Sequence, residues 1–273
     1  MSSDRRAFLR NLALTLPALT LFAQGEGVAK AKVEPAPSAG HDMSAFPPSW
    51  SGKEVIAMLI YPGFTALDMV GPHYFLSSLM GAKVVLVAKT KVMVTSDAGL
   101  KFMPDVDFDT CPADLDLLVV PGGTAGTLAA MEDLTTREFV RRQAASAKRV
   151  ASVCTGSLIL GAAGLLKGKK ATSHWLVKDL LSKFGAIPAE GRVVEDGRLI
   201  TAAGVTAGMD FGLHMSLKLR DREYTDSLAL LAEYAPEPPT SAGDPAKAPP
   251  KVRQMMELMM AEFRQKVSAL GSR

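Results

Sequence analysis

The chain has 273 residues, of which 48% are hydrophobic, and a formal net charge of +3. The first 31 residues hold four basic and two acidic side chains, so the rest of the chain carries only +1. A nearly neutral domain gives no reason to expect nucleic acid or an anionic membrane surface as a partner. About 220 residues of this composition are enough to build one sizeable core.

The first residues predict an exported protein. Arg5 and Arg6 are followed by Phe8-Leu9, by a modestly apolar run over residues 12–23 and by an Ala-x-Ala site at residues 29–31. This order is typical of a twin-arginine signal peptide. The alternative is an uncleaved anchor, but the apolar run is shorter than the ~20 residues that span a membrane. We therefore expect a signal peptide over residues 1–31, export by the twin-arginine machinery and a periplasmic location.

Residues 32–50 are rich in Pro, Ala and Ser and are interpreted as a flexible linker, so the folded domain is expected over residues 51–273. In that domain, strands alternate with helices. Short continuous apolar runs predict parallel strands that are covered on both faces. These runs lie at residues 55–61, 84–88, 115–120 and 150–153.

Helices are expected at residues 69–79 and 135–147, and right-handed crossovers place such helices on both faces of the sheet. Alternating segments at residues 91–108 and 192–202 predict hairpins, the second around Asp196-Gly197. A long helix is expected to follow residue 208 and run to about residue 232, and a final helix covers residues 250–270. The predicted fold class is α/β and flavodoxin-like, a parallel sheet between two layers of helices.

A cysteine stands where one of these strands turns into a helix. Cys154 follows the strand at residues 150–153 and is flanked, two positions away on each side, by the small residues Ser152 and Gly156. This spacing is typical of a nucleophile elbow, in which the backbone turns too sharply for larger side chains. The N-terminus of the next helix favours thiolate over thiol. Cys154 is therefore a candidate nucleophile, although most free cysteines are small buried hydrophobes.

Ligands of such sheets collect at the carboxyl ends of the strands. Asp68 follows the first strand there, and it is either a helix N-cap or a proton partner for Cys154. Gly122 and Gly123 follow the third predicted strand, where their N–H groups can act as oxyanion donors. Gly204 lies in a third glycine-containing turn and is expected in the same pocket.

His174 and Trp175 follow a further short strand and are candidate pocket residues, although a structural role for the histidine is the alternative. No histidine belongs to a metal-binding spacing such as H-E-x-x-H and no cysteines are close in sequence, so we expect no metal site.

Several longer motifs resemble the PfpI superfamily, and within it the isonitrile hydratase branch. They are Leu67-Asp68-Met69-Val70-Gly71-Pro72, Pro121-Gly122-Gly123-Thr124, Ser152-Val153-Cys154-Thr155-Gly156-Ser157-Leu158, Ala171-Thr172-Ser173-His174-Trp175 and Gly204-Val205-Thr206-Ala207-Gly208-Met209-Asp210-Phe211. The resemblance implies a homodimer of class I glutamine amidotransferase-like subunits that hydrates isonitriles to N-substituted formamides without a cofactor. It also implies that Cys154, Asp68 and Thr155 are the catalytic residues.

Many superfamily members have a histidine directly after the cysteine, where this chain has Thr155. That difference favours the hydratase branch over Cys-His chemistry. Two alternatives stay open: an enzyme that acts on reactive carbonyls, as glyoxalases and deglycases do, and a non-catalytic small-molecule-binding module of the same fold.

Overall fold

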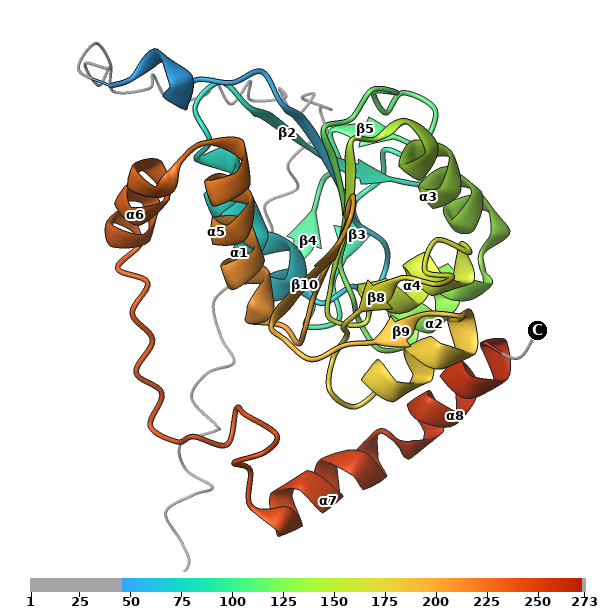
Figure 1. Cartoon of the computed structure of the whole chain (residues 1–273). Helices are drawn as coiled ribbons and strands as arrows, with labels where there is room; N and C mark the ends of the chain where they lie inside the picture. The colour runs from blue at the N-terminus through green and yellow to red at the C-terminus, as the bar shows by residue number, and fades with distance from the viewer. Residues whose placement is uncertain (1–45, 272–273) are drawn as a thin grey trace, which may run out of the picture. The chain divides into compact units, whose positions relative to one another are not determined.

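The central feature of the protein is a seven-stranded sheet, seen in a computed structural model that describes residues 46–271 (Figure 1). In the order of their pairing, the strands are β10 (Val193–Asp196), β11 (Leu199–Ala202), β7 (Arg149–Val153), β6 (Leu117–Val120), β1 (Val55–Leu59), β2 (Lys83–Ala88) and β5 (Val106–Asp107). All neighbours pair in parallel except β10 and β11, which form an antiparallel hairpin. The prediction of a flavodoxin-like α/β fold is confirmed.

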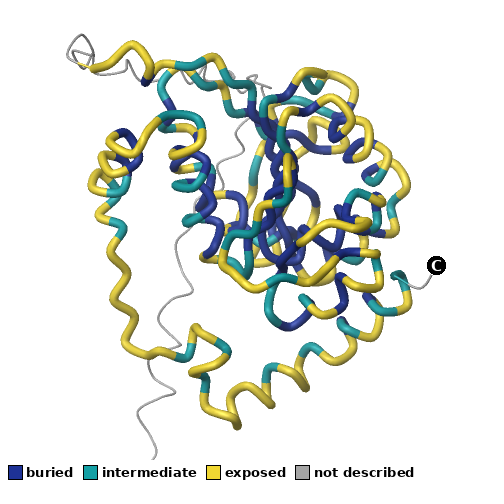
Figure 2. The backbone as a smooth tube through the Cα atoms, in the orientation of Figure 1, coloured by how far each residue is buried: buried dark blue, intermediate teal, exposed yellow. Residues whose placement is uncertain are grey.

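Helices cover both faces of the sheet (Figure 1). One layer consists of α1 (Ala66–Ser77), α5 (Ala207–Leu219) and α6 (Arg222–Leu231), and the other of α2 (Ala125–Glu132), α3 (Leu134–Ser146) and α4 (Gly156–Ala162). The central strands are apolar and buried on both faces because each face packs against a helical layer. Figure 2 shows this buried core between the two layers.

Both predicted hairpins are present, but the first is shorter than the predicted segment over residues 91–108, because β5 pairs with β2 in the main sheet. β3 (Val94–Thr95) pairs antiparallel with β4 (Lys101–Phe102), and β10 pairs antiparallel with β11 across Asp196-Gly197. The short strands β8 (Lys170–Ala171) and β9 (Ile187–Pro188) form a small parallel pair, and two 3-10 helices cover Pro48–Trp50 and Lys178–Phe184.

The long helix expected after residue 208 is in fact two helices. The backbone leaves the helical region at Arg220, whose buried guanidinium binds Glu54 and the carbonyl of Trp50. Asp221 then caps α6 by accepting a hydrogen bond from the N–H of Tyr224 at 2.8 Å. An N-cap of this kind satisfies a backbone donor that would otherwise lack a partner, so it starts a new helix.

The final helix is also divided, at Met260, into α7 (Pro250–Met259) and α8 (Ala261–Leu270). α8 buries Phe263 and Val267, whereas no residue of α7 is buried. Arg264 pairs with Asp179 and thereby ties α8 to the 3-10 helix over Lys178–Phe184. Within residues 46–271, no helix is both long and apolar enough to cross a membrane.

The signal peptide predicted over residues 1–31 and most of the linker predicted over residues 32–50 lie outside the described residues.

Candidate active site

The candidate site lies at the carboxyl edge of the sheet, where the register of three strands brings distant residues together. Val120 at the end of β6 is opposite Ser152 of β7, and Ala202 at the end of β11 is opposite Val153. Cys154, the residue after β7, therefore stands between the residues that follow β6 and those that follow β11. α1 begins after the neighbouring strand β1 and carries Asp68 to the same edge.

Cys154 lies in a sharp strand–turn–helix connection. Its φ angle is +58°, in the left-handed region that non-glycine residues seldom adopt, and only Thr155 separates it from α4. Its N–H donates to the carbonyls of Ala202 and Ala203, and its own carbonyl accepts from the hydroxyl of Ser173 at 3.0 Å. These hydrogen bonds hold the strained turn in place.

Gly156 shows why the turn needs a small residue. A Cβ atom at this position would come within 2.2 Å of the carbonyl oxygen of Val120 and 2.8 Å of Pro121. The first turn of α4 can therefore lie against the end of β6 only because residue 156 has no side chain.

Asp68 is fully buried beside Cys154. Its Oδ2 atom accepts a hydrogen bond from the N–H of Gly122 at 2.9 Å. Its Oδ1 atom has no hydrogen-bond partner among the described residues. The carboxyl also interacts with the thiol of Cys154. Asp68 lies inside the first turn of α1 and does not cap that helix, so the N-cap alternative is wrong.

Burial and the shared environment shift the pKa values of both groups. Burial raises the pKa of Asp68 from its ordinary value of 3.8 to about 7, although hydrogen bonds from Gly122 and Cys154 oppose the rise. Burial, followed by the nearby charge of Asp68, raises the pKa of the Cys154 thiol well above its ordinary value. Backbone hydrogen bonds from Thr155 and Val205 to the sulfur lower it and only partly offset this effect.

The expectation that the helix N-terminus favours a thiolate therefore does not hold for the resting site, because burial and the Asp68 charge outweigh it. Near pH 7 the carboxyl loses its proton while the thiol keeps its own. The pair then consists of a thiol donor beside a carboxylate base, two groups that titrate together.

Gly122 and Gly123 have different roles from the one predicted. The N–H of Gly122 is taken by Asp68, and the N–H of Gly123 donates to Thr155 Oγ1 at 2.9 Å. Thr155 Oγ1 in turn donates to the carbonyl of Gly123 at 2.6 Å. The interpretation of the two glycines as oxyanion donors is therefore not supported, because both N–H groups already have protein partners. The N–H groups directed at the sulfur are those of Thr155 and Val205.

His174, Trp175 and Gly204 meet in one cleft of about 640 Å³ beside the Cys154 turn. Gly204 lies against the imidazole, since a Cβ atom on it would be 3.0 Å from Cδ2 of His174. Burial lowers the pKa of His174, which favours the neutral imidazole. Arg253 of α7 lies 5.7 Å above the ring of Trp175.

This cleft is also lined by Ser173, Ala203 and Val205, each of which contacts Cys154 through a hydrogen bond. Cys154 itself is only 5% exposed. The cleft therefore lies beside the Cys154 turn, and Ser173, Ala203 and Val205 stand between it and the buried sulfur.

Sequence reasoning missed Val205, Tyr61 and Thr127. Val205 could have been found, because it follows Gly204 at the start of a helix on the same edge. The hydroxyls of Tyr61 and Thr127 form a buried chain to Thr155, but no sequence spacing links residues 61, 127 and 155. Over residues 46–271, no group of three His, Cys, Asp or Glu side chains is arranged to hold a metal ion.

Comparison with known proteins identifies the family of the chain. Residues 54–217 match the DJ-1/PfpI family. An isonitrile hydratase from Pseudomonas putida is 49% identical over 197 residues, which cover 72% of this chain and 86% of that protein. The deglycase PfpI from Pyrococcus furiosus is 30% identical over 140 residues, covering 51% and 83%.

A THiJ/PfpI family protein from Pseudomonas syringae has a crystal structure that superimposes on this one with a TM-score of 0.82. The two chains are 54% identical, and the match covers 89% of this chain and 99% of the other.

Proposed function

The chain belongs to the DJ-1/PfpI family, and we propose that it hydrates isonitriles to N-substituted formamides. The observation that carries this proposal is the buried pair of Asp68 and Cys154, in which a carboxyl with a pKa of about 7 stands beside a protonated thiol. The pair contains a nucleophile and a group that can both accept and return a proton near neutral pH.

The first half of the reaction forms a covalent adduct. The Asp68 carboxylate takes the thiol proton as the sulfur attacks the terminal carbon of R–N≡C. Asp68 then delivers that proton to the same carbon, which gives the thioimidate R–N=CH–S–Cys154. Proton transfer within the buried pair avoids the cost of a free thiolate in an apolar environment.

The second half releases the product. The Asp68 carboxylate accepts a proton from water as the oxygen adds to the thioimidate carbon, and it passes this proton to the nitrogen. The C–S bond of the resulting adduct, R–NH–CH(OH)–S–Cys154, then breaks as Asp68 takes the hydroxyl proton and returns it to the sulfur, which gives the formamide R–NH–CHO. One water is consumed, and neither an oxidant nor a cofactor is needed.

The test is formamide release from a small aliphatic isonitrile by purified mature protein. Cys154→Ala is expected to abolish it, and Asp68→Asn, which cannot exchange the proton, to lose a factor of about 100 or more. The double variant should be no worse than Cys154→Ala alone, because both residues act on one proton. Full turnover by Cys154→Ala would exclude the covalent route.

A second candidate is an enzyme of carbonyl stress, since the similar Pyrococcus furiosus protein is a deglycase. Thr155 stands directly after the cysteine, and its hydroxyl is engaged with the Gly123 backbone and is unavailable as a base for the thiol. This favours the hydratase. A glyoxal-consumption assay run beside the isonitrile assay separates the two, because only one substrate class should turn over.

We also propose that the protein is a homodimer and is exported to the periplasm. α1 presents Leu67, Val70 and Tyr74, each more than 40% exposed, and Leu67 and Val70 line one hollow together with the exposed Leu100. Such an apolar patch is suited to a second copy of the chain. Light scattering should give twice the monomer mass, and Val70→Glu should lower it.

A further inference from the structure

We propose that Tyr61 and Thr127 are positioning residues for the Asp68–Cys154 pair. They belong to a chain of buried hydroxyls that fixes the loop at residues 121–123, to which Asp68 is hydrogen-bonded. The role assigned to them rests on the proposed function, but one of the tests below does not use an isonitrile.

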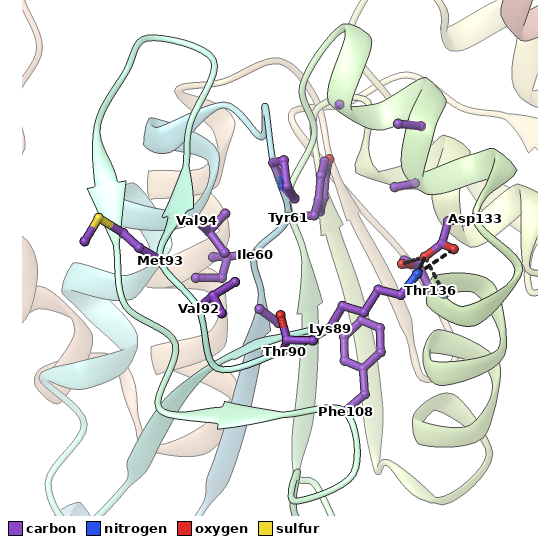
Figure 3. A pocket seen from close by; sticks show the side chains of 15 residues that line it. Ile60, Tyr61, Lys89, Thr90, Val92, Met93, Val94, Phe108, Asp133 and Thr136 are labelled. Carbon is purple, nitrogen blue, oxygen red and sulfur yellow. Dashed lines mark hydrogen bonds and ion pairs between the residues drawn. The ribbon is translucent and has the colours of Figure 1, made fainter.

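Three hydroxyls from distant parts of the sequence form this chain. Tyr61 Oη lies 3.1 Å from Thr127 Oγ1, which lies 3.0 Å from Thr155 Oγ1. All three residues are buried. Figure 3 shows the ring of Tyr61 in the wall of an apolar cavity of about 280 Å³, with its hydroxyl directed away from Lys89 and Thr90. The ring therefore packs against the cavity, and the hydroxyl oxygen takes part in the chain of hydroxyls.

The two ends of the chain hold the same loop from both sides. Tyr61 donates to the carbonyl of Pro121 at 2.8 Å, and Thr155 binds both the N–H and the carbonyl of Gly123. Between these two anchors lies Gly122, whose N–H binds Asp68. Fixing the carbonyls on either side of Gly122 fixes the direction of that N–H.

The hydroxyl of Thr127 lies between the two anchors. The chain has four hydroxyl contacts that need a proton, namely Tyr61 with Pro121, Tyr61 with Thr127, Thr127 with Thr155, and Thr155 with the Gly123 carbonyl. Three hydroxyls supply only three protons. When both ends donate to the loop, the single proton of Thr127 goes to one neighbour or the other. Its hydroxyl therefore donates to one end at a time, and the contact with the other end holds no proton at that moment.

The loop position bears on the Asp68 carboxyl directly. The hydrogen bond from Gly122 favours the carboxylate and opposes the effect of burial. The other titratable groups that act on Asp68 are Cys154, from the turn after β7, and Asp97, from the hairpin between β3 and β4. Burial, with a smaller contribution from the charge of Asp68, raises the pKa of Tyr61, which therefore stays a hydroxyl donor. Loosening the loop should raise the pKa of Asp68 further.

The experiment compares the pH dependence of turnover in Tyr61→Phe, Thr127→Val and wild type. Activity should rise with pH as Asp68 ionises, and the midpoint of that rise should move up by about half a pH unit or more in both variants. Below the midpoint, turnover should fall about threefold or more. Complete loss of a hydrogen bond to a charged group shifts the pKa of that group by roughly one to two units. Weakening the bond from Gly122 should therefore shift the pKa of Asp68 by a fraction of that amount.

Matched controls separate positioning from general loss of stability. Tyr224→Phe removes another buried tyrosine hydroxyl, which donates to the carbonyl of Ser78 at 2.7 Å, and Thr225→Val removes another buried threonine hydroxyl. These variants should lower the melting temperature without moving the pH midpoint. Thr127→Ser, which restores the hydroxyl, should bring the midpoint back to that of wild type.

The pH midpoint can also be measured without an isonitrile, from the rate at which iodoacetamide alkylates Cys154. The extent of alkylation is determined from the mass of the peptide that contains Cys154. If wild type turns over no isonitrile but the alkylation midpoint shifts in the variants, the proposed function fails and the positioning role stands. If neither midpoint moves in a folded Tyr61→Phe protein, or if the controls move it equally, the positioning role is overturned. Tyr61→Phe keeps the ring, so it carries the test if Thr127→Val does not fold.

Discussion

Replacing Asp68 by Asn is expected to stabilise the protein at pH 8 while removing most of its activity. The side chain is fully buried, and burial is the largest cause that raises its pKa from 3.8 to about 7. A carboxyl whose pKa is higher in the folded than in the unfolded state destabilises the fold once it is ionised. The penalty is absent well below pH 3.8, grows as the pH rises toward 7 and is complete above that value.

The magnitude follows from the size of the pKa difference. A rise from 3.8 to about 7 corresponds to ~4 kcal/mol of unfolding free energy at pH 8, and to ~2 kcal/mol at pH 5. Asparagine avoids this penalty because it stays neutral. It introduces a buried amide whose hydrogen bonds are imperfect, which costs about 1–2 kcal/mol. We therefore expect a net gain of about 2 kcal/mol at pH 8 and almost none at pH 5.

The assay is urea denaturation of wild type and Asp68→Asn at pH 5 and pH 8. Asp226→Asn, an exposed carboxyl on α6 paired with Arg222, is the control for losing one negative charge. It should change the unfolding free energy by less than about 1 kcal/mol at either pH. If Asp68→Asn destabilises the protein equally at both pH values, the carboxyl is not an ionised, poorly solvated group and the proposed proton transfer loses its basis.

Three further outcomes are expected. Gly156→Ala should lower the unfolding free energy by about 2 kcal/mol or more, since its Cβ would lie 2.2 Å from the Val120 carbonyl; Gly243→Ala, which meets nothing within 4 Å, should not. Changing Arg5 and Arg6 together to Lys should leave precursor in the cytoplasm, and equal recovery of this variant from the periplasm would contradict a twin-arginine signal. Both cysteines are free, so thiol titration of the denatured protein should find two thiols, and finding none would indicate a disulfide.

Local sequence patterns were sufficient for most of the fold. Apolar runs identified the central strands, because a parallel strand covered on both faces leaves no polar positions. The two breaks at Arg220 and Met260 were missed, since helical spacing continues across both points. The first break depends on a buried guanidinium whose partners, Glu54 and Trp50, are more than 160 residues away.

The sequence by itself determined the chemistry available at the sheet edge. Cys154 between small residues predicted a turn at the end of a strand, and the structure has that turn, with Gly156 against β6. Asp68 could be assigned to the same edge because parallel strands end together. The motifs also sufficed to indicate the family.

Only the tertiary structure decided what each of these groups can do. The pKa of a carboxyl depends on the water it loses and the donors it gains, and for Asp68 these are set by burial and by the Gly122 N–H. The same packing engages the N–H groups of Gly122 and Gly123, which sequence alone assigned to a ligand. Tyr61 and Thr127 join the site for the same reason. The hydroxyl of Tyr61 meets that of Thr127, and Thr127 meets Thr155, only after β1, α2 and β7 have packed together.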